Sequence, residues 1–123
     1  MSPVVYLCSD LLFTSKIRET AAALGLEAVA ARDAGAVAAL AAGARCVVVD
    51  LRRPDALLAL DGLRAVADVP SIGFCDHERV ERMDEARAHG CTEVVAKGKF
   101  SAYLRLMLQP APAPVDDSGR PAA

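Results

Sequence analysis

The sequence predicts an α/β protein in which helices cover both faces of one parallel sheet, a doubly wound arrangement. Two observations support this fold class. Short β-branched runs alternate with longer Ala- and Leu-rich segments, which is the pattern of repeated βαβ units. The chain has 123 residues, of which 54% are hydrophobic. It is long enough to form one hydrophobic core and too short for two ordinary domains.

The candidate strands are short apolar runs. They cover residues 4–8, 27–30, 45–50, 70–75 and 93–96. The third run contains Val47, Val48 and Val49 without interruption, which is typical of a strand covered on both faces. We therefore expect the third strand to lie in the middle of the sheet.

The candidate helices follow each strand in turn. They cover residues 13–24, 34–42, 55–66, 78–89 and 101–108. Gly25, Gly43 and Gly90 stand where the first, second and fourth of these segments end, and a glycine there closes a helix in the left-handed conformation. We therefore expect positive φ angles at these three glycines.

The C-terminal segment differs in composition from the rest of the chain. Residues 110–123, "PAPAPVDDSGRPAA", hold four of the seven prolines and almost no side chains that could pack. We expect one domain over residues 1–109 and a disordered, Pro- and Ala-rich tail over residues 110–123.

Charge and cysteine usage exclude several classes of partner. The net charge is −2 and the basic residues are scattered, so we expect no nucleic-acid binding. No window approaches the roughly 18 apolar residues of a membrane span, so we expect no membrane association. The four cysteines form no C-x-x-C pair, which indicates reduced thiols and a cytoplasmic location.

Polar residues at the strand ends are the candidates for chemistry, because ligands of parallel sheets gather at the carboxyl ends of the strands. In "VVVDLRRP" the third strand ends at Asp50, and Pro54 follows four residues later. The other candidates at strand ends are Cys8, Ser9, Asp10, Cys75, Asp76, His77 and Lys97.

These motifs give the chain a resemblance to response-regulator receiver domains, over about residues 4–108. Receivers accept a phosphoryl group on an aspartate that ends a strand and is followed four residues later by proline, as at Asp50 and Pro54. In "GCTEVVAK", Gly90 and Lys97 stand in the register of the family's fifth strand and its lysine. The resemblance implies a five-stranded, flavodoxin-like sheet in the order 2-1-3-4-5.

The chain departs from the receiver pattern at the metal site. The family's two Mg²⁺-binding acids correspond to Cys8 and Ser9, and Asp10 follows one residue later, where its carboxylate is expected to point away from the site. The family's Ser or Thr after the fourth strand is replaced by Cys75, whose thiol is a poor hydrogen-bond donor. We therefore expect no metal ion and no cofactor.

Two roles for Asp50 remain open. It is either a phosphoacceptor or a structural carboxylate that pairs with Lys97 and joins the third and fifth strand ends. We favour the pair, because a missing divalent cation removes most of the charge neutralisation that phosphoryl transfer needs. Cys8 and Cys75 are either an oxidant-sensing thiol pair or, as we favour, small buried hydrophobic residues.

Two apolar stretches are candidates for partner binding. Leu11, Leu12 and Phe13 lie beside the strand-end site, in the region with which receivers dock a histidine-bearing helical bundle. Alternatively, Leu12 and Phe13 pack as a staple at the start of the first helix. Phe100 and Tyr103 belong to the last helix, whose apolar residues spread over more than one face.

The function that follows is a stand-alone pseudo-receiver, a protein-interaction module of bacterial-type signal transduction without enzymatic activity. Its partner would be a histidine kinase or another helical signalling protein, and the last helix could also form a homodimer. One alternative is a working receiver that accepts phosphate at Asp50 in a phosphorelay. Another is a small ligand-binding or enzymatic α/β domain, against which the absence of glycine-rich nucleotide motifs counts.

Overall fold

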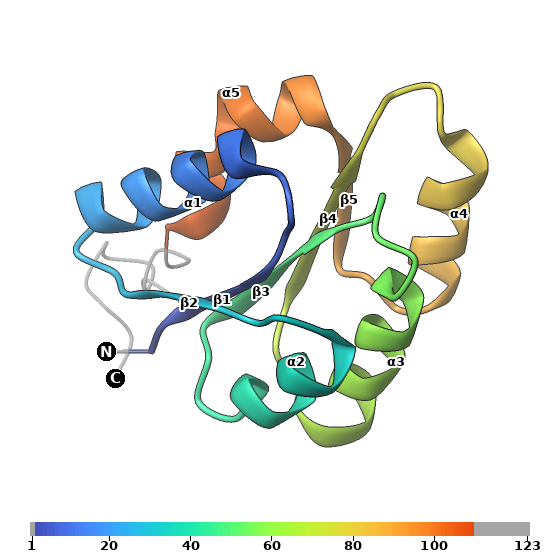
Figure 1. The fold of residues 1–123 in the computed structure, drawn as a ribbon, viewed down its shortest axis with the longest axis horizontal. Helices are drawn as coiled ribbons and strands as arrows, with labels where there is room; N and C mark the ends of the chain where they lie inside the picture. Colours follow the sequence, from blue (N-terminus) through green and yellow to red (C-terminus); the bar gives the residue numbers. More distant parts are fainter. Residues whose placement is uncertain (1, 110–123) are drawn as a thin grey trace, which may run out of the picture.

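The computed structural model describes residues 2–109, in which five strands and five helices alternate along the chain (Figure 1). The strands are β1 (Val4–Leu7), β2 (Ala28–Ala30), β3 (Cys46–Asp50), β4 (Ser71–Cys75) and β5 (Glu93–Ala96). The helices are α1 (Leu11–Ala23), α2 (Ala34–Ala41), α3 (Ala56–Val66), α4 (Val80–Ala88) and α5 (Lys97–Leu108). The predicted tail, residues 110–123, lies outside the described residues.

The five strands form one sheet in the order β2-β1-β3-β4-β5, and every neighbouring pair is parallel. The predicted fold class and strand order are confirmed. The central position of β3 is also confirmed, and Val47, Val48 and Val49 are completely buried. All strands therefore end at the same edge of the sheet, and Asp50 lies in the middle of that edge.

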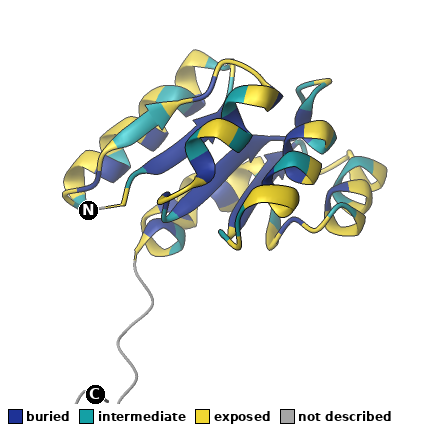
Figure 2. Ribbon diagram, turned by 90° about the horizontal axis from the view of Figure 1, so that it is seen from below, coloured by how far each residue is buried: buried dark blue, intermediate teal, exposed yellow. Residues whose placement is uncertain are grey.

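The helices form two layers around the sheet. α1 and α5 lie side by side on one face, and α2, α3 and α4 cover the other (Figure 1). Because side chains alternate along a strand, Val48 packs with α1 and α5, whereas Val47 and Val49 pack with the three other helices. The strands are buried and the outer faces of the helices are exposed (Figure 2).

Glycines close three of the helices as predicted. Gly25, Gly43 and Gly90 have φ angles of 73°, 81° and 88°. These angles lie in the left-handed region, where a side chain is strained and glycine is not. They are the positive φ angles of the described residues, so α1, α2 and α4 are followed by glycine, whereas α3 and α5 end at Ala67 and Gln109.

Two helices begin earlier than the sequence predicts. α1 begins at Leu11 because the Asp10 side chain accepts hydrogen bonds from the backbone N–H groups of Leu12 and Phe13, at 2.9 and 3.3 Å. α5 begins at Lys97, directly after β5, four residues before the predicted start at residue 101. Its first turn was missed because only one apolar side chain precedes Ser101 there.

Candidate functional site

A hollow of about 430 Å³ opens at the carboxyl edge of the sheet. It is lined by Asp50, which ends β3, and by residues of the loops after β1 and β3: Ser9, Asp10, Arg52, Arg53 and Pro54. Four of them were predicted from the sequence as site residues, whereas Arg52 and Arg53 were not. The hydrogen bonds of these two arginines determine which carboxylate oxygens of the site are free.

Arg52 covers the carboxylate of Asp50. The Asp50 side chain is 4% exposed and accepts hydrogen bonds on both oxygens. Oδ1 accepts from the Arg52 backbone N–H at 3.0 Å and from Arg52 Nε at 2.9 Å, and Oδ2 accepts from Arg52 Nη2 at 3.0 Å. These bonds to Asp50 raise the pKa of the Arg52 guanidinium above its ordinary value. The strand-end acid is thus neutralised by a fixed cation two residues away.

Asp10 joins the same guanidinium. Its Oδ2 accepts a hydrogen bond from Arg52 Nη2 at 3.3 Å, so the expectation that this carboxylate points away from the site is wrong. Asp10 reaches the site because it is the N-cap of α1, which begins at the next residue. The hydrogen bond from the Phe13 backbone N–H is the largest cause that lowers the pKa of Asp10, and the hydrogen bonds from the Leu12 backbone and from Arg52 lower it further.

Aromatic rings hold the other side of the guanidinium. The Arg52 Cζ atom lies 5.4 Å from the ring centroid of Phe13 and 5.8 Å from that of Phe74, within the range of cation–π contact. The Phe74 ring stacks on Phe100 with a centroid distance of 4.1 Å. The guanidinium is therefore placed by carboxylates and by the aromatic core together.

Lys97 does not pair with Asp50, and that prediction is wrong. Lys97 Nζ lies 2.8 Å from Oδ1 of Asp76, the residue that follows β4. β4 and β5 are neighbours in the sheet, so the ends of these two strands bring Asp76 and Lys97 together. The pair lowers the pKa of Asp76 and raises the pKa of Lys97.

Cys8 and Cys75 do not form a thiol pair. Cys8 is half-buried, packs against the core under α1 and α5, and has its Sγ 3.8 Å from Asp50 Oδ2. Cys75 is completely buried in the core under α2, α3 and α4, on the other face of the sheet. Burial raises the pKa of both thiols, so each is protonated at neutral pH.

Two further arginines brace the loops around the hollow. Arg53 binds Asp55 through Nε and Nη2, at 2.9 and 3.0 Å, and also donates to Ser9 Oγ and to the backbone oxygen of Arg32. Arg82 of α4 reaches the same loop after β3. The signal for this network in the sequence was the pair of arginines directly after "VVVDL".

The predicted binding residues separate into two groups. Leu11 and Leu12 are 83% and 76% exposed at the start of α1, and Tyr103 is 51% exposed on α5. Phe13 and Phe100 are buried between these helices and the sheet, so their assignment to a binding surface is wrong. Phe100, Leu104 and Leu108 recur every four residues and form the buried stripe of α5, and Tyr103 lies beside that stripe.

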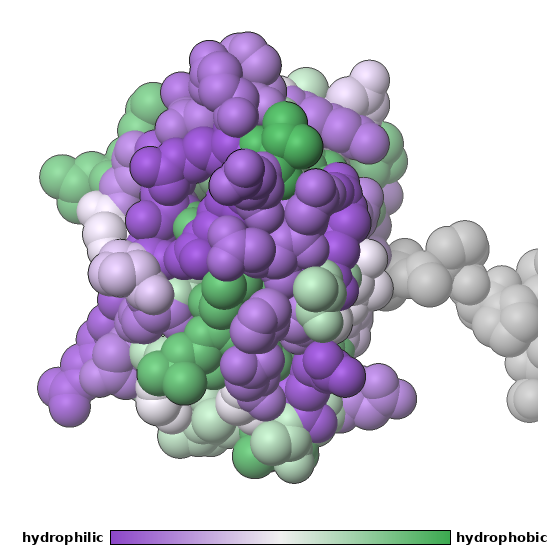
Figure 3. Space-filling model, turned by 90° about the vertical axis from the view of Figure 1, so that its right-hand side faces the viewer, coloured by the Kyte–Doolittle hydropathy of each residue, from purple (hydrophilic) through white to green (hydrophobic). Residues whose placement is uncertain are grey.

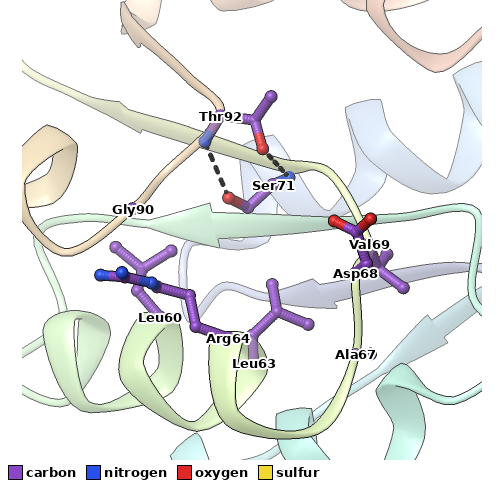
Figure 4. Close-up of a pocket in the computed structure, with 9 residues that line it drawn as sticks. All are labelled: Leu60, Leu63, Arg64, Ala67, Asp68, Val69, Ser71, Gly90 and Thr92. Carbon is purple, nitrogen blue, oxygen red and sulfur yellow. Dashed lines mark hydrogen bonds between the residues drawn. The ribbon is translucent and has the colours of Figure 1, made fainter.

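A second hollow, of about 350 Å³, lies at the opposite, amino edge of the sheet (Figure 4). There Ser71 and Thr92 exchange hydrogen bonds between backbone N–H and hydroxyl groups, both at 3.0 Å. The Arg64 side chain extends across this hollow toward Gly90. The lining of this second hollow shares no residue with the lining of the hollow at Asp50.

Solved structures of receiver domains have the same fold as this chain. The receiver domain of the Francisella response regulator 1452 is 19% identical, with a TM-score of 0.72 over 87% of this chain and 93% of that one. The fold is that of a receiver domain. The receiver domain of NtrX from Brucella abortus is 21% identical, with a TM-score of 0.71 over 85% and 92% of the two chains. A CheY-like protein, TadZ, from Pseudomonas aeruginosa is 15% identical, with a TM-score of 0.72 over 88% and 97%.

Sequence comparison adds no relative to these structures. No protein-family model and no curated protein sequence matches the chain. Within residues 2–109, no helix has the length and apolar character needed to cross a membrane.

The residues around Asp50 do not fit a magnesium ion. Hard divalent cations need oxygen ligands, and Cys8 offers sulfur where a receiver has an acid. Both oxygens of Asp50 and one oxygen of Asp10 already accept hydrogen bonds from Arg52. In the part of the chain that the structure describes, no three His, Cys, Asp or Glu side chains group as metal ligands.

Proposed function

We propose that this chain is a non-catalytic, receiver-like interaction module of bacterial-type signal transduction. The observation that carries the proposal is the double hydrogen bond between Asp50 and Arg52. A phosphoacceptor must present a free carboxylate oxygen to the phosphorus atom, with a cation on the phosphoryl oxygens. Here both oxygens of Asp50 already bind a cation that is part of the chain.

Freeing Asp50 from Arg52 also costs energy. Asp50 can attack a phosphoryl donor only after Arg52 leaves it, which exposes a side chain that is otherwise 4% accessible. A pair of opposite charges at about 4 Å is worth roughly 4 kcal/mol at an effective dielectric near 20. Each 1.36 kcal/mol added to a barrier slows a reaction about tenfold, and solvation of the separated charges offsets part of this attraction, so the pair slows transfer by at most about a thousandfold.

Exposed apolar side chains support the interaction role. Leu11 and Leu12 project beside the hollow, and Tyr103 and Leu106 project from α5, with 51% and 64% of their surfaces accessible. The two stretches belong to neighbouring helices on one face of the sheet (Figure 1). We propose that Leu11 and Leu12 contact a helical signalling protein, such as a histidine kinase. A second copy of the chain, bound through α5, is the alternative occupant of the Tyr103 surface.

The first test asks whether Asp50 accepts a phosphoryl group. The purified chain is incubated with acetyl phosphate and Mg²⁺, and its intact mass is measured before and after, with Asp50→Asn as the control. The proposal expects no phosphoryl adduct on either protein. A stoichiometric adduct that is lost in Asp50→Asn would establish the phosphoacceptor function instead.

The second test locates the binding energy. Candidate histidine kinases are titrated against the chain by calorimetry, and the affinities of Leu11→Ala, Tyr103→Ala and Asp50→Asn are compared. We expect the Leu11 change to cost about 2 kcal/mol or more of affinity, because buried anchors dominate interface energies. Asp50→Asn should leave the affinity nearly unchanged. Loss of binding in Asp50→Asn alone would contradict the proposal.

A further inference from the structure

Arg82 connects helix α4 to the turn that carries Arg52. Its Nε donates to the backbone oxygen of Leu51 at 2.8 Å, and its Nη2 donates to the backbone oxygen of Arg53 at 2.8 Å. The two acceptors flank Arg52 on either side. One guanidinium on α4 therefore holds both ends of the segment from which Arg52 reaches Asp50.

The turn itself is short and closed on Asp50. The Arg53 backbone N–H donates to the Asp50 backbone oxygen at 3.1 Å, and the Arg52 backbone N–H donates to the Asp50 side chain at 3.0 Å. The direction of the Arg52 side chain follows from this backbone, because its Nε bonds the same Oδ1 atom as its own N–H. A change in the turn would therefore displace the guanidinium from the carboxylate.

Helix α4 has few other attachments: Met83 packs against the core, and the C-cap residue His89 lies with Nδ1 2.7 Å from Oδ1 of Asp61 in α3. Among its residues only Ala86 is buried, and Val80 is 56% exposed at its first turn. Its N-cap residue, Arg79, makes no capping hydrogen bond through its side chain. The side of the molecule on which α4 lies is largely hydrophilic (Figure 3). The hydrogen bonds of Arg82 and the packing of Met83 thus attach the first half of α4.

We infer that Arg82 is a positioning residue that couples α4 to the Asp50 site. It fixes the turn that places Arg52 on Asp50, and the same bonds fix α4 against the sheet. A force that displaces α4, such as a protein bound to its outer face, loosens Arg52 from Asp50. By linkage, release of Arg52 loosens α4. This coupling holds whether or not the chain acts as an interaction module.

The test measures the exchange of the Arg52 Nε–H proton with water by NMR, in the full chain. The resonance is assigned by its loss in Arg52→Lys. In Arg82→Ala we expect this exchange to accelerate about tenfold or more, because the backbone oxygens of Leu51 and Arg53 lose their charged donor and the turn loosens. Arg87→Ala is the matched control, since Arg87 lies on the same helix and binds Asp84 at 3.0 Å.

The reciprocal arm measures backbone amide exchange in α4. Arg52→Ala should accelerate exchange at residues 82–88 and leave α2, which Arg82 does not contact, unchanged. If Arg82→Ala does not fold, Arg82→Gln is used, because its amide keeps one donor group. Unchanged Arg52 Nε–H exchange in a folded Arg82 variant, equal acceleration in Arg87→Ala, or unaltered α4 exchange in Arg52→Ala would each overturn the inference.

Discussion

The Arg52 guanidinium lies on the Asp50 carboxylate with Nε 2.9 Å from Oδ1 and Nη2 3.0 Å from Oδ2. The same Nη2 is 3.3 Å from Oδ2 of Asp10. One carboxylate oxygen from the end of β3 and one from the loop after β1 thus accept hydrogen bonds from the same nitrogen. The arginine thus supplies the positive charge between the two acids.

Removing Arg52 should destabilise the chain substantially. Arg52→Ala leaves Asp50 buried without a partner, and we expect a loss of about 2 to 3 kcal/mol in the free energy of unfolding. Urea denaturation of this variant, of Asp50→Asn and of the double variant gives the coupling energy of the pair. Arg32→Ala is the control, because Arg32 is 92% exposed and its contact with Asp33 is 3.8 Å long. Equal losses for both arginines would contradict this account.

Removing Arg52 should also create a cation site. In Arg52→Ala, the carboxylates of Asp10 and Asp50 keep their places but lose the guanidinium between them, and hard divalent cations bind paired carboxylate oxygens. We expect Mn²⁺ at millimolar concentration to broaden the NMR signals of residues 8–10 and 50 in this variant and not in the wild type. The double variant with Asp10→Asn should lose the effect. Equal broadening in the wild type would show that Arg52 does not exclude the cation.

The pair of Lys97 and Asp76 should make stability depend on pH at both extremes. The lowered pKa of Asp76 means that its contribution is present above the ordinary value of 3.8 and is lost as the pH falls through the folded-state pKa. The raised pKa of Lys97 means that its contribution is present below 10.5 and is lost as the pH rises through its folded-state value. The pair is therefore at full strength between these limits.

The variant Lys97→Ala tests this pair. Its deficit in unfolding free energy relative to the wild type should be constant from about pH 5 to pH 9 and should shrink as the pH falls below about 4. Urea denaturation at a series of pH values measures this difference. The carboxyl carbon signal of Asp76 should move in Lys97→Ala, whereas that of Asp50 should not. The opposite pattern would restore the pair of Lys97 and Asp50.

Two glycines should respond in opposite directions to alanine. A Cβ atom at Gly73, in β4, would lie 3.0 Å from Leu51 side-chain atoms and 3.1 Å from Cys91 Sγ, so we expect Gly73→Ala to cost about 1 to 3 kcal/mol. Gly98, in the first turn of α5, has open space around its Cβ position. Gly98→Ala should stabilise the chain by about 0.5 to 1 kcal/mol. Thermal denaturation of both variants checks the two signs.

The fold was predictable because its signals are local and repeated. Val47, Val48 and Val49 identify a central strand by composition alone, and Gly25 and Gly43 mark helix ends by a conformation that other residues avoid. The strand order came from resemblance to a family, and the structure agrees with it. The start of α5 was missed because Lys97 and Gly98 give no apolar periodicity.

The site was only half predictable for a different reason. The end of a buried strand places Asp50 and Pro54 without knowledge of their neighbours. The choice of counterion depends on side-chain reach in three dimensions. Lys97 forms its ion pair with Asp76, at the end of the neighbouring strand, whereas Arg52 binds Asp50, two residues before it in the chain. A sequence shows which basic residues lie near an acid along the chain, and it does not show which of them already pair with another carboxylate.

The short outer strands of the sheet bear on how the chain behaves in concentrated solution. β2 has three residues and β5 has four, whereas the central β3 and β4 each have five. An outer strand offers unpaired backbone N–H and C=O groups to any other strand that meets it, and long flat edges promote aggregation. Here each edge offers a row of only three or four residues, and β5 begins with the exposed charge of Glu93. The geometry of the sheet thus opposes edge-to-edge polymerisation.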